Sequence, residues 1–475
     1  MTRRVRKTKV IATLGPACDE VSTLVAMIEA GMDVARLNFS HGSPAEHEGR
    51  LDRLAEACRK TGRSVATMLD TRGIEIRVGE VENGLIDLKH GSEFVLLPEG
   101  QSDSRPGVSV SYAGLASAVE KGDPIHINDG TIELAVRAVE GDAVVCRVDR
   151  GGPLRSRKGV NLPHTDLQFG SMGVANEEDL VFAAEHDMDY VAASFVRNAG
   201  DVEELRAVLA RNGSEIPIIA KIESGRGVAN LDEIVAAANG TMVARGDLGV
   251  ELPVEQVPAV QKQIIRTTVM NGKPVITATQ MLDSMERNPR PTRAEASDVA
   301  NAIFDGTSAV MLSGETAVGA HPAESVKTIA TLARHAEESL SEYGHLQNVR
   351  PDPENEVSEA VSQAAHTMAT HLNAAAILTL TETGFTSRMI SKYRPPCPIL
   401  AVTESAHVER RLCMNWGITA LRCQDEGDDE YKIAYAIKRA KEMGYVEPGD
   451  VVIVTAGLSK QSGSTDMIRV LTVDV

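Results

Sequence analysis

A lysine and a carboxylate two residues apart end one of the most apolar stretches of this chain. The segment IPIIAKIE, Ile216–Glu223, is typical of a buried strand and finishes with Lys221 and Glu223. Residues i and i+2 of a strand project to the same face, so these side chains are expected to lie together, although a solvated ion pair gives the same pattern. The next apolar run, TMVARGDLG, delivers Asp247 one strand-helix-strand unit later, and parallel neighbouring strands bring both carboxylates to one rim. Such a rim can hold Mg²⁺, which takes one or two carboxylates and completes its shell with water and phosphate oxygens.

Two other apolar runs end in oxygen-rich segments. RLNFSHG, residues 36–42, offers a guanidinium for phosphate beside amide and hydroxyl oxygens, and Asp70 with Thr71 follows the next run. Oxygen ligands with a single carboxylate suit a hard monovalent cation, while a hydrogen-bonded loop cluster is the alternative interpretation. His41, within the first segment, is interpreted as a loop hydrogen-bonding residue rather than a general base.

Glycines and hydroxyls complete the set of candidate residues. Glycines flank Asp247 in ARGDLG, which favours approach of main-chain N–H groups to an anion, as it would favour an ordinary strand-to-helix turn. Thr279 follows the run PVITA, and Ser313 and Glu315 lie in LSGET. Each is more often structural than catalytic, so the argument for them is that all follow strand ends.

The runs that precede these residues alternate with helix-length amphipathic stretches. Eight such runs predict the strands of a TIM (β/α)8 barrel, whose site is built at the carboxyl ends of its strands. The runs are KVIATLG, DVARLNF, SVATMLD, DYVAASF, PIIAKI, TMVARG, PVITATQ and SAVMLSG.

Two regions interrupt or follow this pattern. Residues 78–164 contain short β segments and Gly-Asp and Asn-Gly turns, which predict an inserted small β-barrel domain. After a linker at 351–355, new strand-helix alternation predicts a C-terminal α/β domain. We therefore expect a barrel over 1–77 and 165–341, a β-barrel insertion over 78–164 and a third domain over 342–475.

Composition narrows the class of function. The 475 residues carry a formal charge of −18, which disfavours nucleic acid or an anionic membrane as the main partner. No apolar run reaches the length of a membrane span, and the basic start is interpreted as leading into a first strand rather than a signal peptide. The six cysteines form no CxxC pair, which favours the reduced cytoplasm over a disulfide framework or a zinc site.

Six motifs closely resemble those of the pyruvate kinase family: RLNFSHG, LDTRGIEIR, AKIES, MVARGDLGVELP, ATQMLDSM and MLSGETAVGAHP. The similarity runs from Lys7 to about Val475. It implies a barrel domain A, a β-barrel lid B and an α/β domain C, usually in a homotetramer. It also implies phosphoryl transfer from phosphoenolpyruvate to ADP, giving pyruvate and ATP, with Mg²⁺ (or Mn²⁺) and K⁺ as cofactors. Domain C of relatives binds effector phosphates, and the sequence leaves open whether this chain has a phosphorylated allosteric effector and whether that effector is a sugar bisphosphate, a sugar monophosphate or AMP.

The resemblance also assigns roles to residues of this chain. The catalytic residues would be Lys221, Arg36, Thr279 and Ser313, and the substrate contacts Arg36, Lys221, Gly246, Asp247 and Thr279. The Mg²⁺ ligands would be Glu223 and Asp247, and the K⁺ ligands Asn38, Ser40, Asp70 and Thr71. Nucleotide contacts would be Asn38, His41 and Arg77, and effector contacts Thr381, Thr383, Gly384, Thr386 and Ser387.

The chain departs from the family pattern at several positions. Arg72 and Ile74 replace lysine and proline, so the loop loses the fixed φ of proline. Glu75 favours K⁺ dependence because K⁺-independent relatives tend to carry lysine there, whereas Val78 stands where K⁺-dependent forms often have threonine. Arg226 replaces an acidic or neutral residue.

A further departure concerns the nucleotide. Glu178 reverses the charge of a lysine that approaches ADP in relatives, and Lys158 or Arg157 can compensate. Two alternatives to the kinase hypothesis stay open at the level of the sequence: a Mg²⁺-dependent aldolase or lyase acting on pyruvate enolates, and a catalytically weak metabolite sensor.

Overall fold

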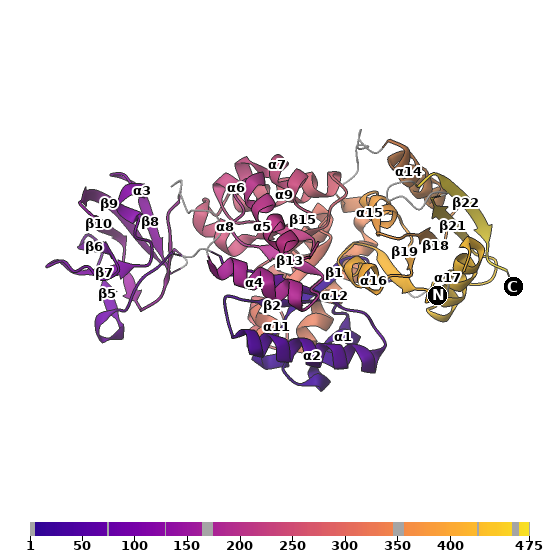
Figure 1. Ribbon diagram of the computed structural model, residues 1–475, viewed down its shortest axis with the longest axis horizontal. Helices are drawn as coiled ribbons and strands as arrows, with labels where there is room; N and C mark the ends of the chain where they lie inside the picture. The colour runs from indigo at the N-terminus through magenta and orange to yellow at the C-terminus, as the bar shows by residue number, and fades with distance from the viewer. Residues whose placement is uncertain are drawn as a thin grey trace.

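The computed structural model describes seven stretches of the chain. They are residues 5–73, 76–128, 130–163, 174–344, 356–424, 427–457 and 465–474. The expectations about Ile74, Glu75 and the linker 351–355 lie outside them. Figure 1 shows three bodies in a row: a small β domain, a central barrel and an α/β domain.

The central body is a closed barrel of eight parallel strands, as predicted. Its strand order is β1-β17-β16-β15-β14-β13-β3-β2, closing through the pair β1 and β2. The strands are nearly continuous apolar runs because both of their faces are buried, one inside the barrel and one under the helices. They are β1 (Lys9–Thr13), β2 (Val34–Asn38), β3 (Ala66–Asp70), β13 (Tyr190–Ala193), β14 (Ile218–Ile222), β15 (Gly240–Ala244), β16 (Val275–Ala278) and β17 (Ala309–Leu312).

Longer helices surround the barrel, and shorter ones occur in the segments between or after its strands and long helices. The main helices are α1 (Val21–Ala30), α2 (Pro44–Thr61), α4 (Val174–Glu185), α5 (Ala199–Arg211), α7 (Leu231–Ala237), α9 (Val257–Met270), α10 (Arg293–Asp305) and α12 (Pro322–Glu338). The short ones are η1 (Pro16–Cys18), α6 (Gly225–Ala229), α8 (Arg245–Glu251), η3 (Asp283–Glu286), α11 (Gly314–Ala317) and α13 (Leu340–Tyr343).

The inserted body is a seven-stranded sheet that nearly closes on itself. Its order is β4-β12-β8-β9-β10-β6-β7, and an isolated bridge between Val78 and Val110 connects the two edges. His126 Nδ1 lies 3.0 Å from the carbonyl oxygen of Val250, so this body contacts helix α8 of the barrel. Its elements are β4 (Ile76–Arg77), η2 (Glu82–Gly84), β5 (Ile86–Leu88), β6 (Glu93–Pro98), β7 (Gly107–Val110), α3 (Leu115–Ala118), β8 (Pro124–Ile127), β9 (Ile132–Glu140), β10 (Ala143–Arg150), β11 (Gly152–Leu154) and β12 (Gly159–Asn161).

The C-terminal body is an α/β layer with strand order β20-β19-β18-β21-β22, in which β22 is antiparallel. Met414 of this body is fully buried among the side chains that fill the barrel interior, so the body closes the amino-terminal end of the barrel. Its elements are α14 (Glu356–His371), β18 (Ala376–Leu380), α15 (Phe385–Lys392), β19 (Ile399–Thr403), α16 (Ala406–Leu412), β20 (Ile418–Arg422), α17 (Asp429–Glu442), β21 (Val451–Ala456) and β22 (Met467–Thr472).

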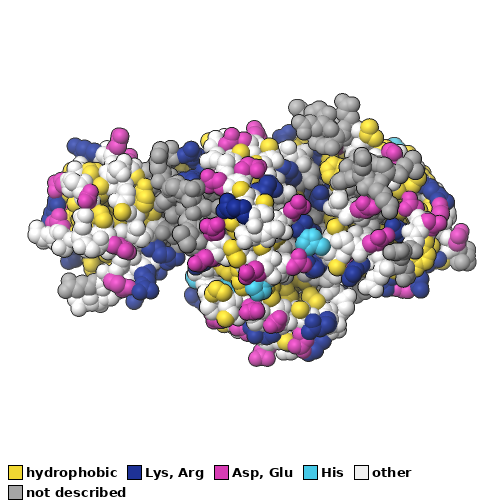
Figure 2. Space-filling model, viewed as in Figure 1, with side chains coloured by type: hydrophobic (Ala, Val, Ile, Leu, Met, Phe, Trp, Pro, Cys, Tyr) yellow, Lys and Arg dark blue, Asp and Glu magenta, His cyan; other side chains and the backbone are white. Residues whose placement is uncertain are grey.

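Three general features of the structure relate to the composition of the chain. In the part of the chain that is described, no helix combines the length and apolar character needed to span a membrane. Acidic and basic side chains are interspersed on the face that Figure 2 shows. All six cysteines are free thiols.

Candidate active site

Lys221 lies at the centre of the polar residues on the carboxyl rim of the barrel. Its Nζ is 2.8 Å from Asp70 Oδ1, 3.0 Å from Glu223 Oε1 and 2.7 Å from Ser194 Oγ. Burial works against the ammonium form, but the charges of Asp70 and Glu223 outweigh it and raise the pKa of Lys221. The side chain therefore offers a fixed positive charge at neutral pH.

Arg36 supplies a second positive charge beside Lys221. Its Nε donates to Asp70 Oδ2 at 2.7 Å and its Nη1 to Thr13 Oγ1 at 2.9 Å. Asp70 thus lies between the two cations, one on each carboxylate oxygen. Burial favours the neutral acid, but Arg36 and Lys221 prevail and lower the pKa of Asp70.

Glu223 is held by two donors of different kinds. Its Oε1 faces Lys221, and its Oε2 accepts the backbone N–H of Phe195 at 2.6 Å. The carboxylate is 1% exposed, so its orientation is fixed before any ligand binds. Strands β14 and β15 pair with Ile222 opposite Val243, which sets the ends of both strands level.

Asp247 lies in the first turn of α8, directly after β15. The paired ends of β14 and β15 therefore bring Glu223 and Asp247 to the same rim, as the sequence predicts. Among the described residues no group of three or more His, Cys, Asp or Glu side chains is arranged to hold a metal ion. Two carboxylates fit Mg²⁺, which takes most of its ligands from water and phosphate.

The residues expected to bind K⁺ lie at the paired ends of β2 and β3, where Asn38 is opposite Asp70. Asn38 Oδ1 accepts the N–H of Ser40 at 3.2 Å, and Thr71 Oγ1 accepts the N–H of Ser194 at 3.2 Å. Both oxygens of Asp70 already face cationic side chains. The side-chain oxygens of Asn38, Asp70 and Thr71 therefore make hydrogen bonds or ion pairs at this rim.

Thr279 adopts an unusual backbone conformation at the end of β16. Its φ is +71°, a region that β-branched residues rarely occupy. Arg245 holds it there, because its Nη2 donates to the Thr279 carbonyl at 2.5 Å while its Nη1 pairs with Asp298 at 2.6 Å. A Cβ at position 246 would lie 3.0 Å from Thr279 Cγ2, so Gly246 leaves the room that Thr279 needs.

Ser313 and Glu315 are coupled through the backbone N–H of Ser313 and the side-chain carboxylate of Glu315. Glu315 is 2% exposed, and its two oxygens accept the N–H groups of Leu282 at 2.9 Å and Ser313 at 2.7 Å. Burial raises the pKa of Glu315. This carboxylate ties the segment after β16 to the segment after β17, so its position at the rim reflects a structural role.

The residues expected near the nucleotide come from both the barrel and the inserted body: Asn38 ends β2 and Arg77 ends β4. His41 and Arg77 are exposed, and Arg77 Nη1 donates to the Arg157 carbonyl at 2.9 Å. The charge reversal at Glu178 has a partner, because its Oε2 lies 3.4 Å from Arg72 Nη2. Arg72 also makes a closer pair, 2.6 Å, with the buried Asp179.

The residues expected to bind an effector lie between β18 and the first turn of α15. Gly384 has a φ of +79°, and its N–H donates to Thr381 Oγ1 at 2.8 Å. The hydroxyls of Thr386 and Ser387 are buried against those of Thr465 and Thr379. The carbonyl of Thr383 accepts a bond from Arg388 at 3.1 Å.

Three contributions to the site were missed by sequence reasoning: the Ser194 hydroxyl, the Phe195 N–H and Arg245. Ser194 lies near the end of the run DYVAASF and directly follows the observed strand β13, so the rule that found the residues after the other strands would also have found it. The Phe195 N–H has no sequence signal because every residue except proline carries a backbone N–H.

An eight-stranded barrel with an inserted β domain, a C-terminal α/β domain and a rim of fixed positive charges beside carboxylates defines a TIM-barrel enzyme built for an anionic substrate. Comparison with known proteins gives the particular family. The family model for the pyruvate kinase barrel domain matches residues 5–326, and the model for the pyruvate kinase alpha/beta domain matches residues 359–471. The chain belongs to the pyruvate kinase family.

Relatives match over nearly the full chain. A pyruvate kinase of Geobacillus stearothermophilus is 47% identical over 98% of this chain and 80% of its own length. One of Clostridium acetobutylicum is 45% identical over 99% of this chain and 100% of its own length. One of Bacillus licheniformis is 44% identical over 99% of this chain and 81% of its own length.

Proposed function

We propose that this protein transfers the phosphoryl group of phosphoenolpyruvate to ADP, giving pyruvate and ATP, with Mg²⁺ (or Mn²⁺) and K⁺ as cofactors. The observation that carries the proposal is the position of Lys221, whose side chain is 12% exposed and whose ammonium lies between Asp70 and Glu223 at the barrel rim. Family membership supports the same reaction.

Phosphoryl transfer asks the protein for positioning and charge neutralisation more than for covalent chemistry. Lys221 is kept protonated by its neighbours, and Arg36 is fixed by Asp70 and Thr13, so both cations face an incoming phosphate without reorganising. Removing a preorganised donor of this kind costs on the order of 10²–10³ in turnover.

Glu223 and Asp247 would hold the Mg²⁺, and Asn38, Ser40, Asp70 and Thr71 would surround the K⁺. When bound, Mg²⁺ supplies positive charge to the phosphoryl oxygens. Glu223 suits this role because its carboxylate is oriented by Phe195 N–H. The Mg²⁺ would add to the charge that Lys221 already provides.

Pyruvate formation further requires a proton on the enolate carbon. We assign to Thr279 and Ser313 the ordering of water at that carbon, since Arg245 and Glu315 fix their backbones at the rim. Asn38, His41 and Arg77 would contact the nucleotide, and Arg72 would balance Glu178 there.

Regulation and assembly form a second part of the proposal. The turn at Thr381–Ser387 would bind the phosphate of an effector through backbone N–H groups, as turns with Gly in the left-handed region can. The protein would act in the cytoplasm as a homotetramer. The regulatory part is tested by adding sugar phosphates and AMP in turn. A phosphoenolpyruvate saturation curve that none of them changes would contradict it.

The reaction is tested by following pyruvate with lactate dehydrogenase while ADP, Mg²⁺ and K⁺ are omitted in turn. We expect each omission to abolish or strongly reduce the rate. Pyruvate release without ADP would contradict the kinase hypothesis and favour a lyase. Full activity with Na⁺ in place of K⁺ would contradict the monovalent-cation site while leaving the phosphoryl transfer intact.

A further inference from the structure

Strand β13 touches two parts of the molecule that lie far apart. It has four residues, Tyr190–Ala193, and is flanked by Asp189 at its start and Ser194 at its end. Its start contacts the C-terminal body, and its end contacts Lys221 and Glu223. With about 3.3 Å per residue, the two contacts are roughly 16 Å apart.

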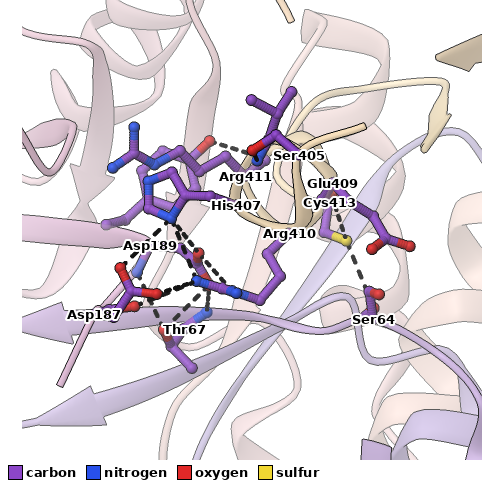
Figure 3. A network of polar contacts seen from close by, with 12 residues as sticks. Ser64, Thr67, Asp187, Asp189, Ser405, His407, Glu409, Arg410, Arg411 and Cys413 are labelled. Atoms are coloured by element: carbon purple, nitrogen blue, oxygen red, sulfur yellow. Dashed lines mark hydrogen bonds and ion pairs between the residues drawn. The ribbon is translucent and has the colours of Figure 1, made fainter. Parts of the chain in front are cut away.

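The start of the strand is fixed by a network that Figure 3 shows. Asp189 is fully buried, and its Oδ2 accepts the N–H of Thr67 at 2.9 Å and the hydroxyl of Thr67 at 3.2 Å. Thr67 belongs to the neighbouring strand β3. Arg410 of α16 completes the network across the boundary between bodies, with its Nε 2.9 Å from Asp189 Oδ1.

Arg410 has a second carboxylate partner that differs from the first in burial. Its Nη2 lies 2.8 Å from Asp187 Oδ2, and the Asp187 side chain is 75% exposed. His407 also faces both carboxylates, with Nδ1 at 3.7 Å from Asp187 and 3.8 Å from Asp189. Leaving a fully buried carboxylate without its cation costs far more free energy than leaving an exposed carboxylate without one. The contact of Arg410 with Asp189 therefore matters more for stability than its contact with Asp187.

Two further contacts hold the same end of the strand. The hydroxyl of Tyr190 donates to the carbonyl of Arg411 at 2.7 Å. Met414 packs against the barrel interior that includes Tyr190. Polar and apolar contacts therefore hold the start of β13 against α16 and the segment that follows it.

The other end of β13 holds the active-site groups. Ser194 Oγ accepts from Lys221 Nζ at 2.7 Å and donates to the Thr71 carbonyl at 2.8 Å. Phe195 N–H donates to Glu223 Oε2 at 2.6 Å. Because β13 is short and paired in parallel with β3, a shift at Asp189 and Thr67 is carried along the strand to Ser194 and Phe195.

We propose that Arg410 of the C-terminal body is a positioning residue for Lys221 and Glu223, acting through Asp189 and strand β13. The part of this inference that concerns metal binding rests on the proposed role of Glu223. A positioning residue loosens the end of β13 when it is removed, whereas a residue that only stabilises the interface lowers the melting temperature and leaves the site as it was.

The test compares Arg410→Gln with Asp187→Asn as a matched control and Arg410→Lys as the conservative variant. Asp187→Asn removes the exposed carboxylate from the same guanidinium, and Asn tolerates the positive φ of +47° at that position. Three kinds of measurement are made. The first is kcat and KM for phosphoenolpyruvate, and the second is Mn²⁺ binding to the substrate-free protein by electron paramagnetic resonance. The third is hydrogen exchange of the metal-free protein, read on the proteolytic peptide that covers residues 193–197.

We expect Arg410→Gln to lower kcat roughly tenfold or more, since a small misplacement of catalytic groups is costly. It should weaken Mn²⁺ binding roughly tenfold, the effect expected when a contact that orients a metal ligand is lost. It should also speed hydrogen exchange in the 193–197 peptide. Arg410→Lys should recover part of each loss, and Asp187→Asn should match the wild type.

A lowered melting temperature with wild-type Mn²⁺ binding and wild-type exchange would overturn the inference. Absence of Mn²⁺ binding in the wild type would instead contradict the proposed metal site, and the exchange of the 193–197 peptide would still decide the inference. Should Arg410→Gln fail to fold, Asp189→Asn carries the same test, because it keeps the shape of the side chain and removes its charge. Unchanged exchange in that variant would overturn the inference.

Discussion

At the level of single residues, the site depends on how the Lys221 ammonium is shared among its neighbours. Two carboxylates attract it strongly, and the Ser194 hydroxyl offers an uncharged acceptor on another side. The Ser194 hydroxyl donates its proton to the Thr71 carbonyl, so its oxygen lone pairs can accept a hydrogen bond from the Lys221 ammonium. Ser194 thus orients the lysine without adding charge.

Ser194→Ala tests this role. We expect kcat to fall roughly tenfold, since the ammonium would move toward its carboxylates and away from the transferring phosphate. The coupled pyruvate assay measures it. Ser117→Ala is the control, because Ser117 Oγ makes a similar bond of 2.8 Å to a backbone carbonyl in the inserted body. A wild-type kcat for Ser194→Ala would show that the carboxylates alone orient Lys221.

The sequence predicted the charged residues of the site better than it predicted their partners. Lys221, Glu223 and Asp70 follow apolar runs, so the rule that barrel sites lie at strand ends found them. Glu315 follows such a run too, yet its two oxygens accept hydrogen bonds from the backbone N–H groups of Leu282 and Ser313. That distinction depends on contacts between segments distant in sequence, which spacing alone does not reveal.

At the level of elements, strands were predictable and loop conformations were not. All eight barrel strands coincide with the predicted runs, because burial on both faces demands continuous apolar sequence. The left-handed backbone of Phe195 and Thr279 could not be foreseen, since neither residue type favours it. Arg245 imposes it on Thr279 through bonds to the carbonyl, and those bonds exist only in the folded barrel.

Helix α10, which precedes β17, begins with a capping box that gives a prediction about pH. Thr292 Oγ1 accepts the N–H of Glu295, and Glu295 accepts the N–H of Thr292 at 2.6 Å and that of Ser284 at 2.7 Å. Partial burial opposes the charge of Glu295, but the bonds from Ser284 and Thr292 prevail and lower its pKa. The unfolded chain therefore binds the proton more readily than the folded one does.

Glu295→Gln should cost about 1 kcal/mol at pH 7, the usual size of a cap contribution. Because the folded pKa is depressed, the advantage of the wild type is present above the ordinary pKa of 4.5 and is lost as pH falls through the folded value. Urea midpoints of both proteins at pH 7 and at pH values below 4.5 measure it. Glu324→Gln, an exposed carboxylate in the first turn of α12, is the control. A wild-type advantage that stays constant with pH would contradict the assignment.

At the level of the whole molecule, the C-terminal body completes the barrel. Met414 fills the amino-terminal end of the barrel interior, and Lys9 donates from β1 to the carbonyl of Ile418 at 2.6 Å. Trp416, the single tryptophan of the chain, is 3% exposed beside these contacts, with the Arg394 guanidinium 4.5 Å from its ring centroid. Its fluorescence therefore reports on the boundary between the two bodies.

Met414→Ala should destabilise this boundary by about 2–5 kcal/mol, because it removes a fully buried side chain from a packed interior. We expect the urea midpoint of Trp416 fluorescence to fall, and enzymatic activity to be lost at the same urea concentration, since the barrel and the C-terminal body share one core at this point. Met368→Ala is the control: Met368 lies on α14 and is 37% exposed, so its truncation should change the free energy of unfolding by less than about 0.5 kcal/mol. Equal urea midpoints for the two variants would mean that the Met414 side chain does not stabilise the barrel interior. Activity that persists after the fluorescence transition would mean that the barrel holds its site without the C-terminal body.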